Sequence, residues 1–270
     1  MNLYFEEIEH KYFCKELPAQ KWISVSGLFD MVKPKFDSEA ISINYSKKGK
    51  NAILQDLAKK WELTIDEAVE KWGHLEFTPE QIRTIWEEKK DKGLARGTAF
   101  HKAVEKKLLN RDGIAGNQIE GEYRKSLDLK NLAPGKYIEL IIPYPVLFLT
   151  GTADRVEILP NKEFIIRDWK SDNKLEYKGT AYFDPKIKEK KVRKLLPPLN
   201  HLDDVNGVHY NVKESLYIYF LESYGYKFKE GWIDHVQFEK DEPVGIVEYP
   251  ITYLKKEVIN LLNWYKLKKK

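Results

Sequence analysis

The chain has 270 residues, of which 33% are charged and 42% hydrophobic, an ordinary balance for a globular protein that can bury a substantial core. The net charge is only +4, which argues against the whole molecule being a general binder of polyanions. Cys14 is the only cysteine, which excludes intramolecular disulfides and four-cysteine zinc or iron–sulfur sites; it reads as a buried or edge thiol.

The N-terminal part of the chain predicts short strands at 3–7 and 21–29, followed by helices between Phe36 and Asn110. The first residues, MNLYFEEIEHK, lack the apolar core of a signal peptide. Thr64 is placed to begin one helix, and Thr78 with Pro79 and Gln81 forms the capping signature of the next. We expect that helix to end at Gly93 and a further helix, capped by Thr98, to cover 96–110.

The remaining elements are expected to be strands at 136–142, 231–238 and 245–251, with a hairpin at 151–170 and helices at 207–225 and from about Tyr253. The longest apolar stretch, 141–149, is too short and too proline-broken to span a bilayer, so we expect a cytoplasmic protein without a membrane partner. Basic residues gather at 186–194 and 266–270. The tail reads as solvated surface, while 186–194 is either surface or a local polyanion contact.

The hairpin carries charged residues at strand positions, which requires a compensating reason. With a loop at 160–162, the alternation places Asp154 opposite Asp168 and puts Lys170 on the same face. The apolar pairs Ile158/Phe164 and Val156/Ile166 share that face. The other face brings Arg155 opposite Arg167, which is unfavourable unless Glu157 or a phosphate lies nearby.

Two neighbouring carboxylates repel each other and raise each other's pKa unless a cation neutralises them. A divalent metal bound by oxygen ligands meets that need, and Mg²⁺ is the first candidate, with Mn²⁺ as a substitute. The sequence thus predicts a metal site at the end of the hairpin. The plain alternative is an ion pair between Asp154 and Lys170.

The order of these motifs resembles the PD-(D/E)XK nuclease superfamily, within it the branch of RecB-like and lambda-exonuclease-like enzymes. The likeness spans roughly 95–240 and rests on GTxxHxxxE from 97, GTAD from 151 and DWK from 168. It implies an α/β (α+β) fold with a restriction-endonuclease-like core, in which helices flank a central mixed β-sheet. We expect strands and helices in an N-terminal subdomain at 1–95 and the nuclease core at 96–270.

By this resemblance Asp154 and Asp168 would hold the metal, with the backbone carbonyl of Trp169 and the ring of His101 as further ligands. Lys170 would orient the attacking water or neutralise charge on the phosphate. His101 has a plain alternative as a core histidine. The remaining candidates have alternatives too: Glu105 either orients His101 or faces solvent, and Glu139 is either a third carboxylate or a surface residue.

The chain departs from the family at one place. Where RecB-like members carry QxxxY on the helix after the DxK strand, this chain has Lys213 and Tyr217. Lys213 either contacts the DNA backbone or extends to solvent. Tyr217 is either a site residue or a core aromatic.

The resemblance implies a metal-dependent deoxyribonuclease, first of all an exonuclease acting on DNA ends in phage-type recombination or replication. A nicking or structure-specific endonuclease of the same superfamily is the nearest alternative, and a non-catalytic nucleic-acid binder on this scaffold is the other. DNA is the expected partner. A homo-oligomer or a phage single-strand annealing or binding protein is the further partner that the family suggests.

Overall fold

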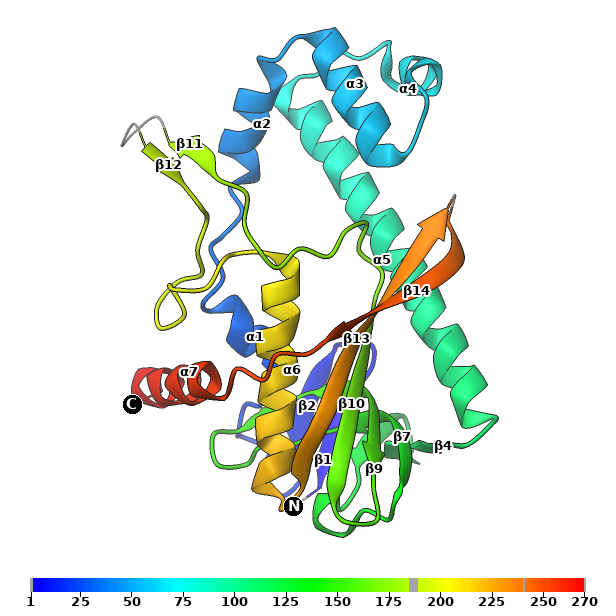
Figure 1. Cartoon of the computed structure of the whole chain (residues 1–270), viewed down its shortest axis with the longest axis vertical. Coiled ribbons are helices and arrows are strands. Elements are labelled where there is room, and N and C mark those ends of the chain that lie inside the picture. Colours follow the sequence, from blue (N-terminus) through cyan, green and yellow to red (C-terminus); the bar gives the residue numbers. More distant parts are fainter. Residues whose placement is uncertain (1, 185–188, 240, 270) are drawn as a thin grey trace. The chain divides into compact units, whose positions relative to one another are not determined.

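The computed structural model describes residues 2–184, 189–239 and 241–269 (Figure 1). Of the two basic stretches, residues 186–188 and 270 lie outside the described residues. By contacts, the chain divides into two compact units. The first contains Met1–Pro34, His101–Gln237 and Gly245–Lys270, and the second contains Lys35–Phe100 and Phe238–Val244. These contact units are discontinuous in sequence, unlike the expected segments 1–95 and 96–270, because residues 1–34 pack with the sheets of the first unit.

The central element is a six-stranded mixed sheet with the order β14-β13-β10-β9-β7-β4. β10 runs parallel to β13 and antiparallel to β9, while β7 runs antiparallel to β9 and parallel to β4. The expected mixed sheet is therefore confirmed. Its strands are β4 Gly113–Ala115, β7 Gly135–Ile141, β9 Thr152–Ile158, β10 Glu163–Lys170, β13 Lys227–Glu239 and β14 Glu242–Pro250.

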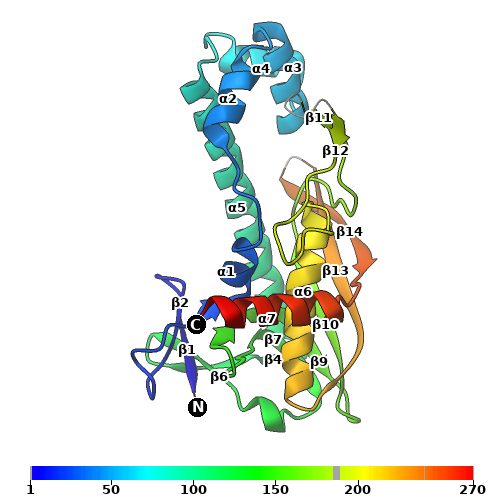
Figure 2. The same cartoon turned by 90° about the vertical axis from the view of Figure 1, so that its left-hand side faces the viewer.

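Helices cover one face of this sheet in the first unit. α6 (Asn206–Ser223) contacts β10, and both α1 (Val25–Asp30) and α7 (Lys255–Lys268) contact α6 (Figure 2). The core between them is built from the apolar residues of β7, β9 and β10 and from α6, whose Val212, Leu216 and Phe220 are fully buried. These three positions are four residues apart, which is the spacing of one helix face.

Smaller sheets complete the first unit. One has the order β2-β1-β6-β5, a second pairs β11 with β12, and a third pairs β3 with β8. Their strands are β1 Leu3–Glu6, β2 Lys11–Cys14, β3 Ile23–Ser24, β5 Asn117–Glu120, β6 Tyr123–Ser126, β8 Leu149–Thr150, β11 Tyr182–Asp184 and β12 Glu189–Lys191. A short 3₁₀ helix, η1, covers Leu129–Asn131. Cys14 is fully buried on β2, as expected.

The predicted strand at 21–29 is wrong beyond its first part. Only Ile23–Ser24 forms a strand, and α1 begins at Val25. The reason is local: the Ser24 hydroxyl accepts a hydrogen bond from Gly27 N at 2.9 Å and so caps a helix.

The second unit is helical, as the pattern from Phe36 onward predicts. Its helices are α2 Ser38–Ser46, α3 Lys50–Trp61, α4 Ile65–Trp72 and the first part of α5 Pro79–Leu109. The capping signatures at Thr64 and Thr78 are both present as hydrogen bonds. The predicted helix break is wrong, however, because α5 continues through Gly93 and Thr98 as one helix of 31 residues. A glycine inside a helix costs only about 1 kcal/mol, which the packing of the rest of the helix can offset.

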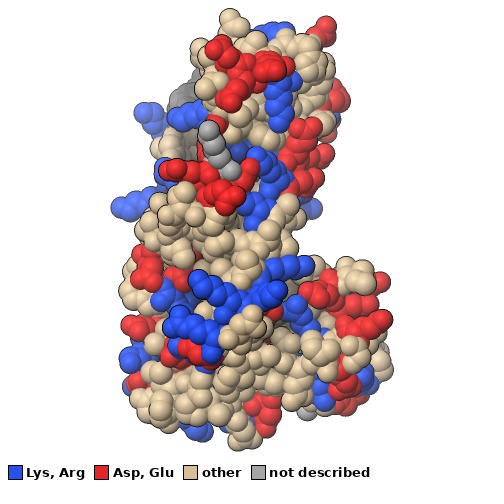
Figure 3. Space-filling model, turned by 90° about the vertical axis from the view of Figure 1, so that its right-hand side faces the viewer, with Lys and Arg blue, Asp and Glu red and all other residues tan. Residues whose placement is uncertain are grey.

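Among the described residues, no helix is both long and apolar enough to cross a membrane. On the face drawn in Figure 3, groups of Lys and Arg are interrupted by Asp and Glu, in keeping with the net charge of +4.

Candidate metal centre

The β9–β10 hairpin has the predicted register over its apolar part. Ile158 lies opposite Phe164 and Val156 opposite Ile166, and the ladder ends at Arg155 and Arg167 (β9 and β10 in Figure 1). The expected next pair, Asp154 with Asp168, is not part of the ladder. Instead Asp154 Oδ2 accepts a hydrogen bond from the backbone N–H of Trp169 at 2.9 Å. The hairpin thus opens at its end, where the carboxylates lie.

The two arginines that face each other across this hairpin are each balanced by carboxylates. Arg155 donates to Glu157 at 3.1 Å, as the sequence suggested. Arg167 makes two hydrogen bonds to Asp234 of β13, at 2.9 and 2.6 Å, and a third to Glu248. These pairs offset the repulsion between the arginines on the face opposite to the aspartates.

Both aspartates are held where their charged forms are disfavoured. Burial raises the pKa of Asp168 to about 6, with Lys170 opposing the shift and Asp154 adding to it. Burial likewise raises the pKa of Asp154, again against the influence of Lys170. A buried carboxylate pair with raised pKa values is a typical feature of a functional site, because a bound cation would restore the charged forms.

Lys170 lies between the aspartates and the Trp169 backbone. Its Nζ is 2.5 Å from Asp168 Oδ2 and donates to the Trp169 carbonyl at 3.2 Å. The contact with Asp168 is a close ion pair, but its angles do not meet hydrogen-bond geometry. Burial lowers the pKa of Lys170, yet Asp168 and Asp154 outweigh burial and raise it. Lys170 therefore carries a charge, and its partner is Asp168 rather than the Asp154 of the plain alternative.

His101, on α5, reaches the same place from the side. Its Nδ1 is 3.5 Å from Asp154 Oδ2. The centres of the His101 and Trp169 rings are 6.2 Å apart, and the rings pack edge to face. Burial, followed by Lys170, lowers the pKa of His101, which favours the neutral ring that can bind a metal. Glu105 lies one helical turn further along α5, and its charge opposes the lowering of the His101 pKa.

Glu139 of β7 lies opposite Asp154 of β9, because the register of the two strands continues without a shift on both sides of it. The ladder with β9 pairs Ile138 with Arg155 and Leu140 with Ala153, and Glu139 between them has a φ of 55°. A left-handed glutamate is strained and is held only where the surroundings require it. Burial raises the pKa of its carboxyl to about 8, with Asp154 and then Glu105 adding to the effect. The structure therefore places Glu139 beside the predicted carboxylates, not on open surface.

Lys213 and Tyr217 both line this region from α6, in different ways. Lys213 Nζ lies 5.7 Å from the ring centre of Tyr210 and 6.0 Å from that of Phe29, and it forms no ion pair with any described residue. Tyr217 is 9% exposed and packs in the core. A Cβ at Gly151 would lie 2.6 Å from both Cε1 and the hydroxyl of Tyr217, which explains the glycine of GTAD.

One further carboxyl, Glu214, was missed by the sequence reasoning. It is 3% exposed, and no described residue forms a hydrogen bond with its buried Oε2. Burial raises its pKa well above the ordinary range, and Asp168 adds to the shift. The signal was available: Glu214 is spaced by four and seven residues from Ile218 and Leu221, which are both fully buried on α6.

The donor types at this site fit a hard divalent cation, although the donors are not assembled as a finished site. Within residues 2–184, 189–239 and 241–269, no three His, Cys, Asp or Glu side chains are arranged to hold a metal ion. Asp168 Oδ2 is buried and forms no hydrogen bond with the part of the chain that the structure describes. Carboxylate and carbonyl oxygens with one imidazole are suitable ligands for Mg²⁺ or Mn²⁺. Binding would require Lys170 to move from Asp168. No model of a known protein family matches the chain, and no curated protein matches it either.

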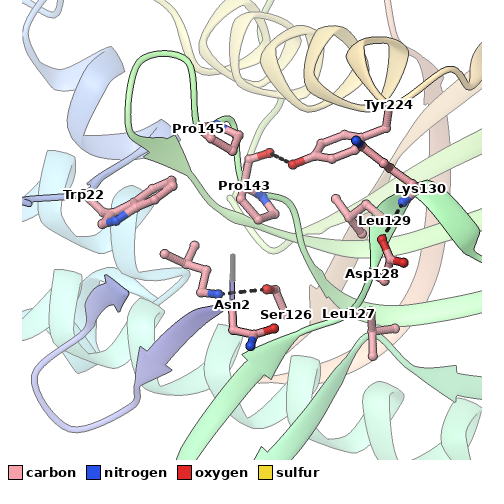
Figure 4. Close-up of a pocket in the computed structure, with 11 residues that line it drawn as sticks. Asn2, Trp22, Ser126, Leu127, Asp128, Leu129, Lys130, Pro143, Pro145 and Tyr224 are labelled. Atoms are coloured by element: carbon pink, nitrogen blue, oxygen red, sulfur yellow. Dashed lines mark hydrogen bonds between the residues drawn. The ribbon is translucent and has the colours of Figure 1, made fainter. Parts of the chain in front are cut away.

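A separate cavity of about 510 Å³ lies elsewhere in the first unit (Figure 4). Trp22, Ser126, Lys130 and Tyr224 are among its lining residues, and the Tyr224 hydroxyl donates to the Pro143 carbonyl at 2.8 Å. None of the described residues that line it belongs to the predicted metal site. The cavity is therefore a feature distinct from the carboxylate cluster.

Proposed function

We propose that this protein is a metal-dependent deoxyribonuclease of the PD-(D/E)XK type, with a restriction-endonuclease-like core, that hydrolyses phosphodiester bonds at DNA ends. The observation that carries the proposal is the convergence of Asp154, Asp168 and Lys170 at the end of one hairpin, with His101 3.5 Å from Asp154. The predicted Trp169 carbonyl lies there as well, since it accepts from Lys170. The mixed sheet with α6 on its face is compatible with this core.

In this proposal Asp154, Asp168, the Trp169 carbonyl and His101 would hold Mg²⁺ or Mn²⁺. When bound, such an ion lowers the pKa of a coordinated water and stabilises charge on the phosphate. Lys170 supplies a fixed ammonium beside the scissile phosphate, where it offsets the negative charge that grows during displacement. Lys213 lies against Tyr210 and Phe29, is partly buried, and pairs with no carboxylate of the residues that the structure describes. It offers a second cation for the DNA backbone.

The test is a cleavage assay on end-labelled linear DNA, single- and double-stranded, with and without Mg²⁺ or Mn²⁺. We expect metal-dependent release of labelled product by the wild type and near-complete loss in Asp168→Asn. Asp112→Asn is the matched control, because Asp112 pairs with Lys136 at the surface of the same unit. Cleavage by Asp168→Asn at the wild-type rate would overturn the assignment.

Closed circular DNA separates the modes of cutting. An enzyme that requires ends leaves closed circles intact, whereas a nicking or structure-specific endonuclease converts them to relaxed or linear forms. Metal-independent binding of DNA without any cleavage would favour the non-catalytic scaffold. We place the protein in the cytoplasm, with DNA as its partner.

A further inference from the structure

Lys170 and the proposed metal compete for the same carboxylate. In the structure Lys170 Nζ is 2.5 Å from Asp168 Oδ2, and that oxygen is one that a divalent cation would use. Once Asp168 turns to a cation, the ammonium loses its counter-charge while its side chain stays only 21% exposed. A buried charge without a partner is costly, so Lys170 needs a second carboxyl.

The carboxyls around Lys170 differ in what they are free to accept. Asp154 already receives the Trp169 N–H and is itself an expected ligand, and Asp172 receives the hydroxyl of Tyr210. Glu214 is neither an expected metal ligand nor an acceptor of a hydrogen bond from a described residue. Its side chain forms no hydrogen bond or ion pair with the residues that the structure describes, and its Oε2 is buried.

Glu214 also lies on the element that covers Lys170. α6 packs on β10, the strand that ends with Lys170, and Glu214 of α6 is 3% exposed. The charges of Glu214 and Lys170 each act on the pKa of the other. A buried carboxyl oxygen without any partner is rare in folded proteins and calls for an explanation in each case. A partner that arrives only in the metal-bound state supplies one.

We propose that Glu214 is a positioning residue that receives the Lys170 ammonium when Asp168 turns to a divalent cation. The inference rests on the proposed function, since it needs a cation at the aspartates. In the metal-free protein Lys170 stays with Asp168. In the loaded protein Glu214 holds Lys170 beside the scissile phosphate.

The electrostatics support this exchange. Burial raises the pKa of the Glu214 carboxyl, Asp168 and Asp154 add to the shift, and Lys170 and Lys213 oppose it. A cation that neutralises the two aspartates removes their contribution and leaves that of the lysines. Metal at the aspartates and charge on Glu214 therefore favour each other.

The experiment measures Mn²⁺ binding by titration calorimetry without DNA, so that its readout does not depend on cleavage. The proteins are wild type, Glu214→Gln, Lys170→Met, the double variant of these two, Asp168→Asn and Glu222→Gln. Glu222 is the matched control, because it lies on α6 like Glu214 but pairs with Lys255 of α7 at 2.8 Å. Glu214→Leu replaces the glutamine variant if that variant does not fold.

We expect Glu214→Gln to weaken Mn²⁺ binding about tenfold, which corresponds to about 1.4 kcal/mol, and Glu222→Gln to leave it unchanged. Lys170→Met should bind Mn²⁺ more tightly, since it removes the competing ammonium. In that background Glu214→Gln should have no further effect, because the two residues act through one interaction. Without metal, the melting temperature of Glu214→Gln should not fall below that of wild type.

Three results would overturn the inference. Equal Mn²⁺ affinity of wild type and Glu214→Gln would do so, and a lower melting temperature alongside it would identify a structural role. A tenfold loss that persists in the Lys170→Met background would identify Glu214 as a direct ligand. If the wild type binds no Mn²⁺, the proposed function fails as well. If Asp168→Asn abolishes Mn²⁺ binding while Glu214→Gln leaves it intact, the role of Glu214 is overturned and the proposed function is not.

Discussion

Replacing Glu139 by glutamine should stabilise the metal-free protein at neutral pH. The folded pKa of Glu139 is about 8, against an ordinary value of 4.5, because burial and the neighbouring carboxylates disfavour its charge. For an acid whose pKa is raised, the folded state keeps a proton that the unfolded state gives up. The contribution of Glu139 to the free energy of unfolding is therefore greatest below pH 4.5, falls as the pH rises toward 8, and is constant above pH 8.

The size of the effect follows from the pH interval over which the two states differ. At pH 7 the interval above 4.5 is 2.5 pH units, and each unit corresponds to about 1.36 kcal/mol, which gives about 3 kcal/mol. Glutamine has nearly the same shape and does not titrate. At pH 7 the free energy of unfolding of Glu139→Gln should consequently be about 3 kcal/mol above that of wild type. At pH 4 the variant and the wild type should have about the same free energy of unfolding.

Urea unfolding in EDTA, repeated between pH 5 and 8, measures this difference. Glu120→Gln is the control with the opposite sign, because Lys15 and then Lys125 lower the pKa of Glu120 to about 2. Its difference from wild type should stay constant over this range. Parallel pH profiles for Glu139→Gln and wild type would refute the reasoning. Added Mg²⁺ should narrow the gap, since a cation beside the carboxylate favours its charged form.

Three further outcomes are expected. Gly151→Ala should lower the free energy of unfolding by about 1–3 kcal/mol, because the new Cβ would lie 2.6 Å from the Tyr217 ring; an unchanged urea midpoint would contradict that close approach. Lys213→Gln should weaken DNA binding and reduce the salt slope by about 1 in a filter-binding series, since one phosphate contact is removed; an identical affinity and slope would show that Lys213 has no role in binding. His101→Gln should raise the Mg²⁺ concentration needed for half-maximal cleavage, because a neutral ring ligand is lost; an unchanged requirement with a lower melting temperature would make His101 a core histidine.

Local signals in the sequence predict local structure well here. The β9–β10 register follows from alternation alone, because a slip by one residue would expose Val156 and Ile158. The Thr78 cap likewise depends on residues three positions apart. Gly93 and Thr98 mislead for the opposite reason: both are also tolerated inside a helix, and only the packing of α5 decides that it continues.

The candidate site divides in the same way. Spacing brings Asp154, Asp168 and Lys170 together, and the structure agrees. The pairing of β7 with β9 sets Glu139 opposite Asp154, and no local pattern around Glu139 specifies that pairing. Glu214 is buried on α6, which packs on β10, and no local pattern of either element specifies that packing.

The connections of the mixed sheet also determine the order in which its strands pair during folding. β9 and β10 are joined by a short turn, so their antiparallel pairing closes a small loop at little entropic cost. The parallel pairing of β10 with β13 must instead close the whole segment between Lys170 and Lys227. Non-local pairing of this kind slows folding. The two aspartates should therefore meet early on the folding pathway, while the helix that carries Lys213 and Glu214 docks late, and a nascent chain gains its hairpin well before it gains its site.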